Sequence, residues 1–260
     1  MADEIKQDVR HKDMMMRAGA AGKEEIVRKV QAALEYEPRI NLHRYPVKIG
    51  FVEGAVVLEG EVEGIAAKKL ALELAAGVGG VRGVVDRLRI APGERRGDGA
   101  IRDSLCGFLL GEAELRNCEI RVRAKGRVGT LRDVPGERSG EIEVAVEDGV
   151  IMLEGTVISL SHKRIVGVLA WWTPGCRDVV NALNVLPPEE DTDEEVLDAL
   201  RLVLEIDPLV QPERIIARCR NYVVTLEGEA RTEEERSRIE LDAWALFAVD
   251  KVINKIEVRA

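Results

Sequence analysis

Side chains that commonly catalyse reactions or bind metals are scarce in this chain. The histidines and cysteines are His11, His43, His162, Cys106, Cys118, Cys176 and Cys219. They form no C-x-x-C pair and no set at zinc-binding spacing, and no serine or cysteine lies in a G-x-S-x-G elbow. Carboxylates are abundant, but no feature selects a catalytic pair. We therefore expect no catalytic residue, no metal site and no cofactor.

The main charged feature is a basic segment at about residues 116–140. Its basic residues include Arg121, Arg123, Lys125, Arg127, Arg132 and Arg138, and its acids are Glu119, Asp133 and Glu137. The alternation in "EIRVRAKGRV" predicts a β-ribbon with one basic face. Clustered positive charge attracts anions, so we expect anionic lipid or a protein partner to contact Arg121, Arg123, Lys125, Arg127 and Arg132. A solvated hairpin extension explains the same pattern equally well.

A further candidate contact is Trp172, in a chain of which only 3% of the residues are aromatic. Trp171 and Trp172 lie near the end of a predicted helix, and Trp244 aligns with Trp171 in an internal repeat. Trp171 and Trp244 are expected to share a packing role between a helix and a neighbouring unit. Trp172 should point elsewhere, either to a membrane surface or partner, where amphipathic rings are favoured, or into a partly buried position.

The elements that must position these residues repeat three times. The segment "VVLEGEV" at residues 56–62 recurs as "IMLEGTV" at 151–157 and as "VTLEGEA" at 224–230. Period-two patterns at residues 47–51, 142–146 and 215–219 predict a strand before each segment, and residues 80–90, 175–185 and 248–258 predict a closing strand. We expect Leu58, Leu153 and Leu226 in the core and the glutamates that follow them in solvent.

Two helices complete each predicted unit. Apolar residues at helical spacing, as at residues 65–76, predict a helix between the second and third strands. Another amphipathic helix precedes each first strand, and Pro38 and Pro208 mark the ends of two of these. The predicted fold class is α+β. It consists of three tandem αββαβ units, each with two helices on one face of a small three-stranded sheet, and an extra β-ribbon in the second unit.

Glycines recur at two positions of this unit. The tight turn between the first two strands is expected at Gly54, Gly149 and, in the third unit, Asn221-Tyr222, because these positions require a positive φ. The strand that follows is expected to bend or to approach a helix closely at Gly60, Gly155 and Gly228. Segments rich in proline, glycine and charge separate the predicted domains. These are an N-terminal arm at residues 1–22 and units at residues 23–91, 98–187 and 192–260.

The overall charge excludes nucleic acid as the expected partner. The formal net charge is −9 and the pI is about 5.2, whereas phosphate binding depends on an excess of lysine and arginine. Residues 188–260 carry most of the imbalance, with 19 acids against 10 basic residues. No apolar run is long enough to span a membrane, and the N-terminus lacks the apolar region of a secretory signal. The sequence as written predicts a cytoplasmic protein, or a periplasmic one if a leader has been removed.

The repeated pattern resembles the BON domain family, named for bacterial osmotic-stress and nodulation-associated proteins. The matching motifs are the turn glycine, V-x-L-x-G-x-V, a helix, and G-V-x-x-V-x-N-x-L, with Asn181 and Asn254 at the asparagine and Asp86 in its place in the first copy. The resemblance implies a non-enzymatic, stress-related protein that binds phospholipid head groups or envelope proteins. The alternative is a self-assembling scaffold, in which the basic insertion meets the acidic third unit of a neighbouring chain head to tail.

Overall fold

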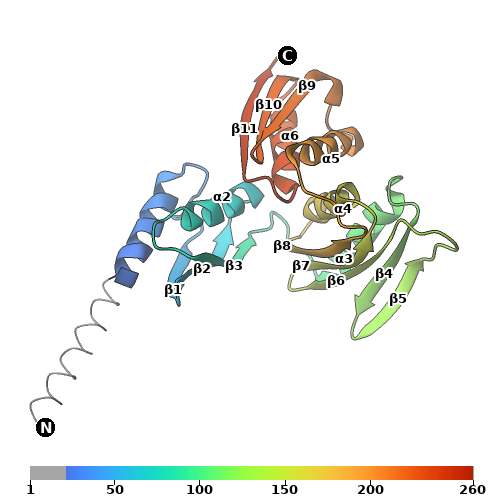
Figure 1. The fold of residues 1–260 in the computed structure, drawn as a ribbon, viewed down its shortest axis with the longest axis horizontal. Helices are drawn as coiled ribbons and strands as arrows, with labels where there is room; N and C mark the ends of the chain where they lie inside the picture. Colours follow the sequence, from blue (N-terminus) through green and yellow to red (C-terminus); the bar gives the residue numbers. More distant parts are fainter. Residues whose placement is uncertain (1–21, 260) are drawn as a thin grey trace, which may run out of the picture. The chain divides into compact units, whose positions relative to one another are not determined.

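The computed structural model describes residues 22–259, so the N-terminal arm expected at residues 1–22 lies almost wholly outside the described residues. The chain divides into two compact units, Met1–Arg89 and Ile90–Ala260. Helices and small sheets alternate along both units (Figure 1). This architecture confirms the predicted α+β class.

The first unit contains the first copy of the repeat. Residues 22–36 are helical, and the elements that follow are β1 (Val47–Val52), β2 (Ala55–Val62), α2 (Ile65–Ala76) and β3 (Gly83–Ile90). The sheet order is β1-β2-β3, so β1 is an edge strand, antiparallel to β2. The core is aliphatic, with fully buried Val30 and Leu34 from the first helix and Leu58 from β2. Both helices end before a proline or glycine, at residue 36 and at Ala76.

The second copy opens the second unit and contains the predicted ribbon. Its elements are α3 (Asp98–Gly111), β4 (Cys118–Ala124), β5 (Arg127–Arg132), β6 (Gly140–Glu147), β7 (Val150–Val157), α4 (Leu160–Trp172) and β8 (Asp178–Val185). β4 and β5 form an antiparallel hairpin, and β4 pairs parallel to β6. The sheet therefore has five strands in the order β5-β4-β6-β7-β8. The alternating pattern correctly predicted the hairpin, but not that it would extend the sheet.

The third copy follows in the same unit. Its elements are α5 (Asp193–Ile206), the 3-10 turn η1 (Pro212–Arg214), β9 (Ile215–Arg220), β10 (Val223–Ala230), α6 (Glu233–Ala245) and β11 (Lys251–Val258). The sheet order is β11-β10-β9, which makes β9 an edge strand like β1. Thr192 and Thr232 cap α5 and α6 by accepting hydrogen bonds from the backbone N–H groups of Glu195 and Glu235. Helix α4 of the second copy packs against both α5 and α6.

The repeated Leu-Glu-Gly has a structural explanation in all three copies. Leu58, Leu153 and Leu226 are fully buried, as predicted. The glycines that follow have φ values of 145°, 126° and 126° in Gly60, Gly155 and Gly228. A Cβ atom on Gly155 would lie 2.0 Å from the carbonyl oxygen of Glu141 on the preceding strand. The close approach is therefore to a neighbouring strand, and the expectation of an approach to a helix was wrong.

The tight turns carry positive φ at both central residues, as a type I′ hairpin requires. The pairs are Glu53-Gly54, Asp148-Gly149 and Asn221-Tyr222. In the third copy Tyr222 stands where glycine stands in the other two, with a φ of 59°. The carboxylate of Asp193 accepts the N–H groups of both Asn221 and Tyr222, at 2.8 and 2.9 Å. Asp98 accepts the N–H groups of Asp148 and Gly149 in the same way, so this support is common to both copies and is not specific to the turn that lacks glycine.

The asparagine of the closing motif is a structural residue. The Asn181 side chain donates to the carbonyl oxygen of Lys163 at 2.8 Å, and its Oδ1 accepts from the N–H of Leu183 at 3.3 Å. In the first copy Asp86 accepts the equivalent N–H and forms a 2.8 Å ion pair with Lys68, whose Nζ atom also donates to the backbone. A buried lysine therefore supplies the donor that the aspartate lacks.

Candidate functional site

Two of the predicted contact residues are engaged within the second copy. Arg121 on β4 pairs with Glu141 on β6 at 2.5 Å. Arg123 pairs with Glu143 on β6 at 2.5 Å and with Glu154 on β7. Sequence reasoning missed these acids because they lie outside the basic segment and reach it only through strand pairing. The carboxylates of β6 and β7 thus neutralise the part of the ribbon nearest the sheet.

Two further arginines fasten the hairpin to the rest of the second copy. Arg132 donates from Nε to the carbonyl oxygen of Cys118 at 2.9 Å and from Nη2 to that of Leu115 at 2.5 Å. Arg138 forms an ion pair with Glu119, which is only 3% exposed. Arg132 was predicted as a ligand contact, and the structure gives it backbone partners instead. Both side chains order the loops that flank the hairpin.

The tip of the hairpin combines charge with exposed apolar surface. Lys125 and Arg127 are exposed, and neither has an ion pair or side-chain hydrogen bond within residues 22–259. Val128 and Leu131 on β5 are 53% and 51% exposed. The sequence prediction omitted both, although "RVGTLR" places apolar residues on an added strand that has no helix to cover it. Lys125, Arg127 and Val128 lie at or next to the turn, and Leu131 lies near the far end of β5; we call these four residues together the hairpin tip.

Trp172 takes a different position from the hairpin residues. It is half-buried, and its indole N–H donates to Asp242 of α6 in the third copy at 2.9 Å. The guanidinium of Arg238 lies 4.6 Å from the centroid of its ring. Of the two positions expected for Trp172, the structure therefore favours partial burial, within the chain's own contact between copies. Trp171 packs beside the core of the second copy, and Trp244 is fully buried.

In the contact between the second and third copies, each copy contributes one arginine that stacks on an aromatic ring of the other copy. Arg238 of α6 stacks on Trp172 of α4, and Arg164 of α4 stacks on Phe247 of the third copy, with its guanidinium carbon 4.5 Å from the ring centroid. Cation–π stacking is stronger for a desolvated guanidinium group such as that of Arg164 than for an exposed one. Arg164 is 1% exposed and is also paired with Asp191. None of the charged members of this contact was predicted, although Asp242 interrupts the apolar face of its helix.

Acidic groups gather beside Trp172. Arg238 forms a 2.5 Å ion pair with Asp207 and lies 3.6 Å from Asp242. Burial, and then the negative charge of Asp207, raise the pKa of Asp242 to about 8. A hollow of about 410 Å³ opens next to this group and is lined by Phe108, Leu169, Trp172, Leu209 and Arg238 among others. The contact thus contains a carboxyl group that titrates near neutral pH.

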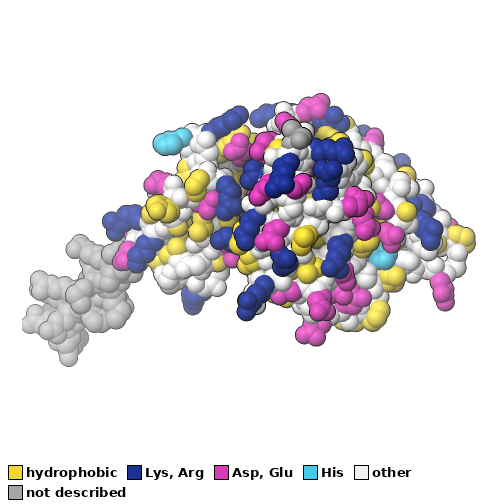
Figure 2. All heavy atoms as spheres, turned by 90° about the horizontal axis from the view of Figure 1, so that it is seen from above, with side chains coloured by type: hydrophobic (Ala, Val, Ile, Leu, Met, Phe, Trp, Pro, Cys, Tyr) yellow, Lys and Arg dark blue, Asp and Glu magenta, His cyan; other side chains and the backbone are white. Residues whose placement is uncertain are grey.

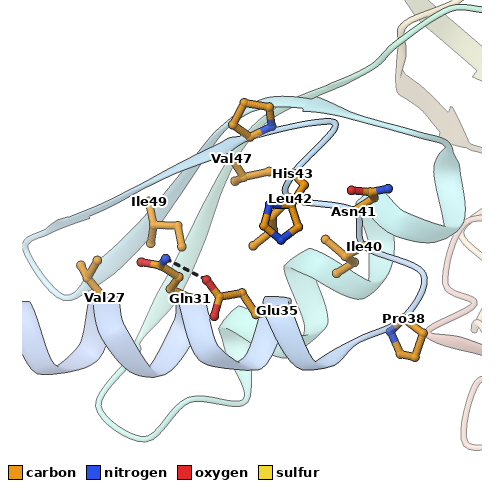
Figure 3. Close-up of a pocket in the computed structure, with 11 residues that line it drawn as sticks. Val27, Gln31, Glu35, Pro38, Ile40, Asn41, Leu42, His43, Val47 and Ile49 are labelled. Atoms are coloured by element: carbon orange, nitrogen blue, oxygen red, sulfur yellow. Dashed lines mark hydrogen bonds between the residues drawn. The ribbon is translucent and has the colours of Figure 1, made fainter.

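A second kind of hollow lies in the first unit, between the first helix and the edge strand β1 (Figure 3). It measures about 570 Å³ and is lined by Val27, Gln31, Glu35, Val47 and Ile49 among others. Gln31 donates to Glu35 at 2.9 Å along the helix. A neighbouring hollow of about 490 Å³ shares Val27 and Ile49 and continues along β1 to Phe51. Together they form a groove that follows β1, which we call the β1 groove.

The third copy has a groove in the same place. A hollow of about 520 Å³ lies between α5 and the edge strand β9, and its lining includes Arg201, Leu204, Glu205, Ile215 and Ala217. By sequence alignment of the copies, Ile215 and Ala217 occupy the positions of Val47 and Ile49 in the β1 groove. We call this hollow the β9 groove. Sequence reasoning missed both grooves because their residues look like ordinary core positions.

Other kinds of site are not indicated in the described part of the chain. No cluster of three or more histidine, cysteine, aspartate or glutamate side chains there is arranged to hold a metal ion. None of the helices within residues 22–259 has the length and apolar character that a membrane span requires. Lysine and arginine side chains are interspersed with acids over the face drawn in Figure 2.

Comparison with known proteins gives a match to one family. The family described as "BON domain" matches residues 22–92, 129–187 and 192–260. A search of curated proteins finds no match. Two solved structures of CdsD, a structural protein of the type III secretion system of Chlamydia trachomatis, align over 90% of this chain and over 97% and 92% of their own. Their identities are 12% and 13% and their TM-scores 0.24 and 0.23, values too low to support any inference.

Proposed function

The chain belongs to the BON domain family, and on this premise we propose that it is a non-catalytic binding protein that contacts anionic phospholipid head groups through the hairpin tip. The family is associated with membrane and phospholipid binding and with osmotic stress. The observation that carries the proposal is the pair of unpartnered cations, Lys125 and Arg127, on the same hairpin as exposed Val128 and Leu131.

The chemistry of the hairpin tip suits a membrane surface. Each lysine or arginine near an anionic leaflet contributes about 1 kcal/mol of attraction. Exposed apolar side chains gain further by entering the boundary between head groups and acyl chains. With two cations and two apolar side chains the contact is weak and reversible. Arg121 and Arg123 add little, because their charges are already balanced within the sheet.

Vesicle co-sedimentation tests the proposal. The full chain should sediment with vesicles that contain phosphatidylglycerol, and much less with pure phosphatidylcholine vesicles. Binding should weaken as salt increases, because exposed charges are screened beyond about 8 Å at physiological ionic strength. The double variant Lys125→Glu/Arg127→Glu should lose most of the binding, and Val128→Ser/Leu131→Ser should weaken it without changing the net charge.

A matched control separates local contact from overall charge. Arg95 and Lys251 are exposed and belong to other segments, Arg95 before α3 and Lys251 at the start of β11. The variant Arg95→Glu/Lys251→Glu changes the net charge as much as the hairpin variant does, and it should bind vesicles nearly as well as the natural sequence. Equal losses in both variants, or binding that ignores lipid charge, would contradict the proposal.

Self-assembly into a scaffold is the alternative function. Both helices of the third copy begin with three consecutive acids, Asp193 to Glu195 in α5 and Glu233 to Glu235 in α6. Asp193 and Glu235 are hydrogen-bonded within the third copy, so the exposed acids Glu194, Glu233 and Glu234 would meet the hairpin tip of a neighbouring chain. Size-exclusion chromatography with light scattering distinguishes the two functions. A salt-sensitive oligomer that Lys125→Glu/Arg127→Glu returns to monomer would favour the scaffold.

A further inference from the structure

The first strand of the repeat has a different neighbour in each kind of copy. In the second copy β6 lies between β4 and β7, whereas among residues 22–259 no strand pairs with the outer edge of β1 or of β9. The burial of equivalent residues follows this difference. Val144 of β6 is fully buried, but its counterparts Ile49 in β1 and Ala217 in β9 are only half-buried. In the first and third copies, therefore, no strand within the described part of the chain covers the residues that are equivalent to Val144.

Strand β4 is the covering strand in the second copy. It runs parallel to β6, with Ile120 opposite Ile142 and Val122 opposite Val144. Cys118 and Ile120 are fully buried in the same core as Ile142 and Val144. A strand beside this edge thus fills the space between the sheet and the first helix of the copy. The second copy therefore shows that the edge of this strand can pair with a parallel strand that has apolar inward residues.

The same space is open in the other two copies. The β1 groove and the β9 groove lie between an edge strand and the first helix of the copy. Their linings combine apolar side chains, such as Ile49 in one and Ile215 in the other, with polar ones, such as Gln31 and Arg201. An edge strand also presents unpaired backbone N–H and C=O groups. Main-chain pairing with an added strand, and pockets for its alternate side chains, are the two components of peptide recognition at a sheet edge.

The charge of the incoming strand follows from the side chains that point away from the helix. On β6 these include Glu141 and Glu143, which the arginines of β4 neutralise. At the position equivalent to Glu143, β1 presents Lys48 and β9 presents Ile216; further along β9 lie Arg218, which is paired with Glu227 of β10, and Arg220. Lys48 and Arg220 have the opposite sign to the glutamates of β6, so a complementary strand carries acids where β4 carries Arg121 and Arg123.

We propose that the β1 and β9 grooves are binding sites for an extended segment of a protein partner, which pairs parallel to β1 or β9. Its inward residues are apolar, like Cys118, Ile120 and Val122 of β4. Its outward residues are acidic. This interaction is independent of the hairpin tip, because β5 and not the grooves forms the outer strand of that hairpin.

A peptide that copies the pattern of β4 tests the proposal against the full chain. The probe carries residues 116–124 with Cys118→Ala, Arg121→Glu and Arg123→Glu and a fluorescent label. Fluorescence anisotropy should show saturable binding with one peptide for each open edge. Val27→Glu places a charge in the β1 groove and should remove one binding site. Ala32→Glu on an exposed part of the same helix is the matched control and should leave both.

Reversing the charge of two β9 side chains tests the β9 groove and the expected negative charge of the partner segment. The variant Arg218→Glu/Arg220→Glu should weaken the acidic peptide at β9 by about tenfold, equivalent to about 1.4 kcal/mol. It should bind the peptide that keeps Arg121 and Arg123 better than the natural chain does. Circular dichroism verifies that each variant is folded.

Three outcomes would overturn the proposal. The first is an acidic peptide that fails to bind. The second is undiminished binding by a peptide with serine at its inward positions or with N-methyl groups that block strand pairing. The third is a self-associated chain that Val27→Glu converts to monomer, because the grooves would then hold a second copy of this chain.

Discussion

The indole N–H of Trp172 donates to Oδ1 of Asp242 over 2.9 Å, and this bond joins the last residue of α4 in the second copy to α6 in the third. Asp242 is fully buried, so its hydrogen bond and its charge both depend on the contact between the copies. Arg238 stacks on the indole ring and lies between Asp207 and Asp242. The protonation state of Asp242 therefore affects how firmly the second and third copies are held together.

The first prediction concerns the pH dependence of stability. The folded chain holds the Asp242 proton up to a pH of about 8, whereas an unfolded aspartate loses it near pH 4. Between these values the folded state binds more protons than the unfolded state, so the free energy of unfolding should fall as the pH rises through this range. Asp242→Asn keeps an oxygen to accept from Trp172 and should abolish that part of the fall. Urea unfolding at pH 5 and pH 8.5 measures it, and identical pH dependence in both proteins would contradict it.

The second prediction separates folding from function in the Leu-Glu-Gly repeat. Leu58→Ala, Leu153→Ala and Leu226→Ala should each lower the free energy of unfolding by about 2 to 5 kcal/mol, because each removes a fully buried side chain. Changing the following glutamate to glutamine should have a much smaller effect, since that residue is at least partly exposed in every copy. Denaturant melts of the six variants compare them. A glutamine variant that keeps its stability but loses binding would show that the repeat is a binding site.

The third prediction concerns the Asp86–Lys68 pair that replaces the motif asparagine in the first copy. A double-mutant cycle with Asp86→Asn and Lys68→Met should give a coupling energy of about 0.5 to 3 kcal/mol, because the two groups meet at 2.8 Å and the lysine is nearly buried. The exposed pair of Arg87 and Glu59, at 3.7 Å, is the control. Its coupling should be near zero, as for most surface pairs. Equal coupling energies in both cycles would contradict the inference that Lys68 and Asp86 together replace the motif asparagine.

The fourth prediction concerns the cysteines, all of which are free thiols in the structure. Burial raises the pKa of Cys106 and of Cys118 to about 11, and the pKa of Cys219 is raised to about 12. Little thiolate is present at pH 8, so the folded chain should react slowly with iodoacetamide. Ellman titration in denaturant should count all four thiols. A lower count would indicate a disulfide and an oxidising compartment.

Much of the fold follows from local patterns. The period-two strands, the helical spacing in α2 and the turn glycine Gly149 each favour one local conformation. Because the pattern occurs in three copies, each copy gives an independent indication of the same fold. The role of Gly155 was less accessible to sequence reasoning. Its positive φ is a local property, but the carbonyl oxygen that approaches it belongs to Glu141, on another strand.

The candidate sites were harder to predict because they depend on pairing between distant segments. The basic ribbon was visible in the sequence, but the acids that pair with Arg121 and Arg123 come from β6 and β7. Trp172 was visible as an unusual residue, but its partner lies 70 positions further along the chain. Similarly, the edge position of β1 follows from the sheet order, which the strand sequence alone does not specify.

The strand that covers β6 also sets how many partners one chain can hold. Three copies would offer three equivalent edges, but β4 closes the middle one and leaves β1 and β9 open. A bivalent chain gains avidity on any partner that displays the same segment more than once, because the second binding event becomes intramolecular. It can link such partners in pairs or in rows, whereas a trivalent chain would cross-link them into branched networks. The inserted β4-β5 hairpin therefore prevents one chain from joining three partners into a branched network.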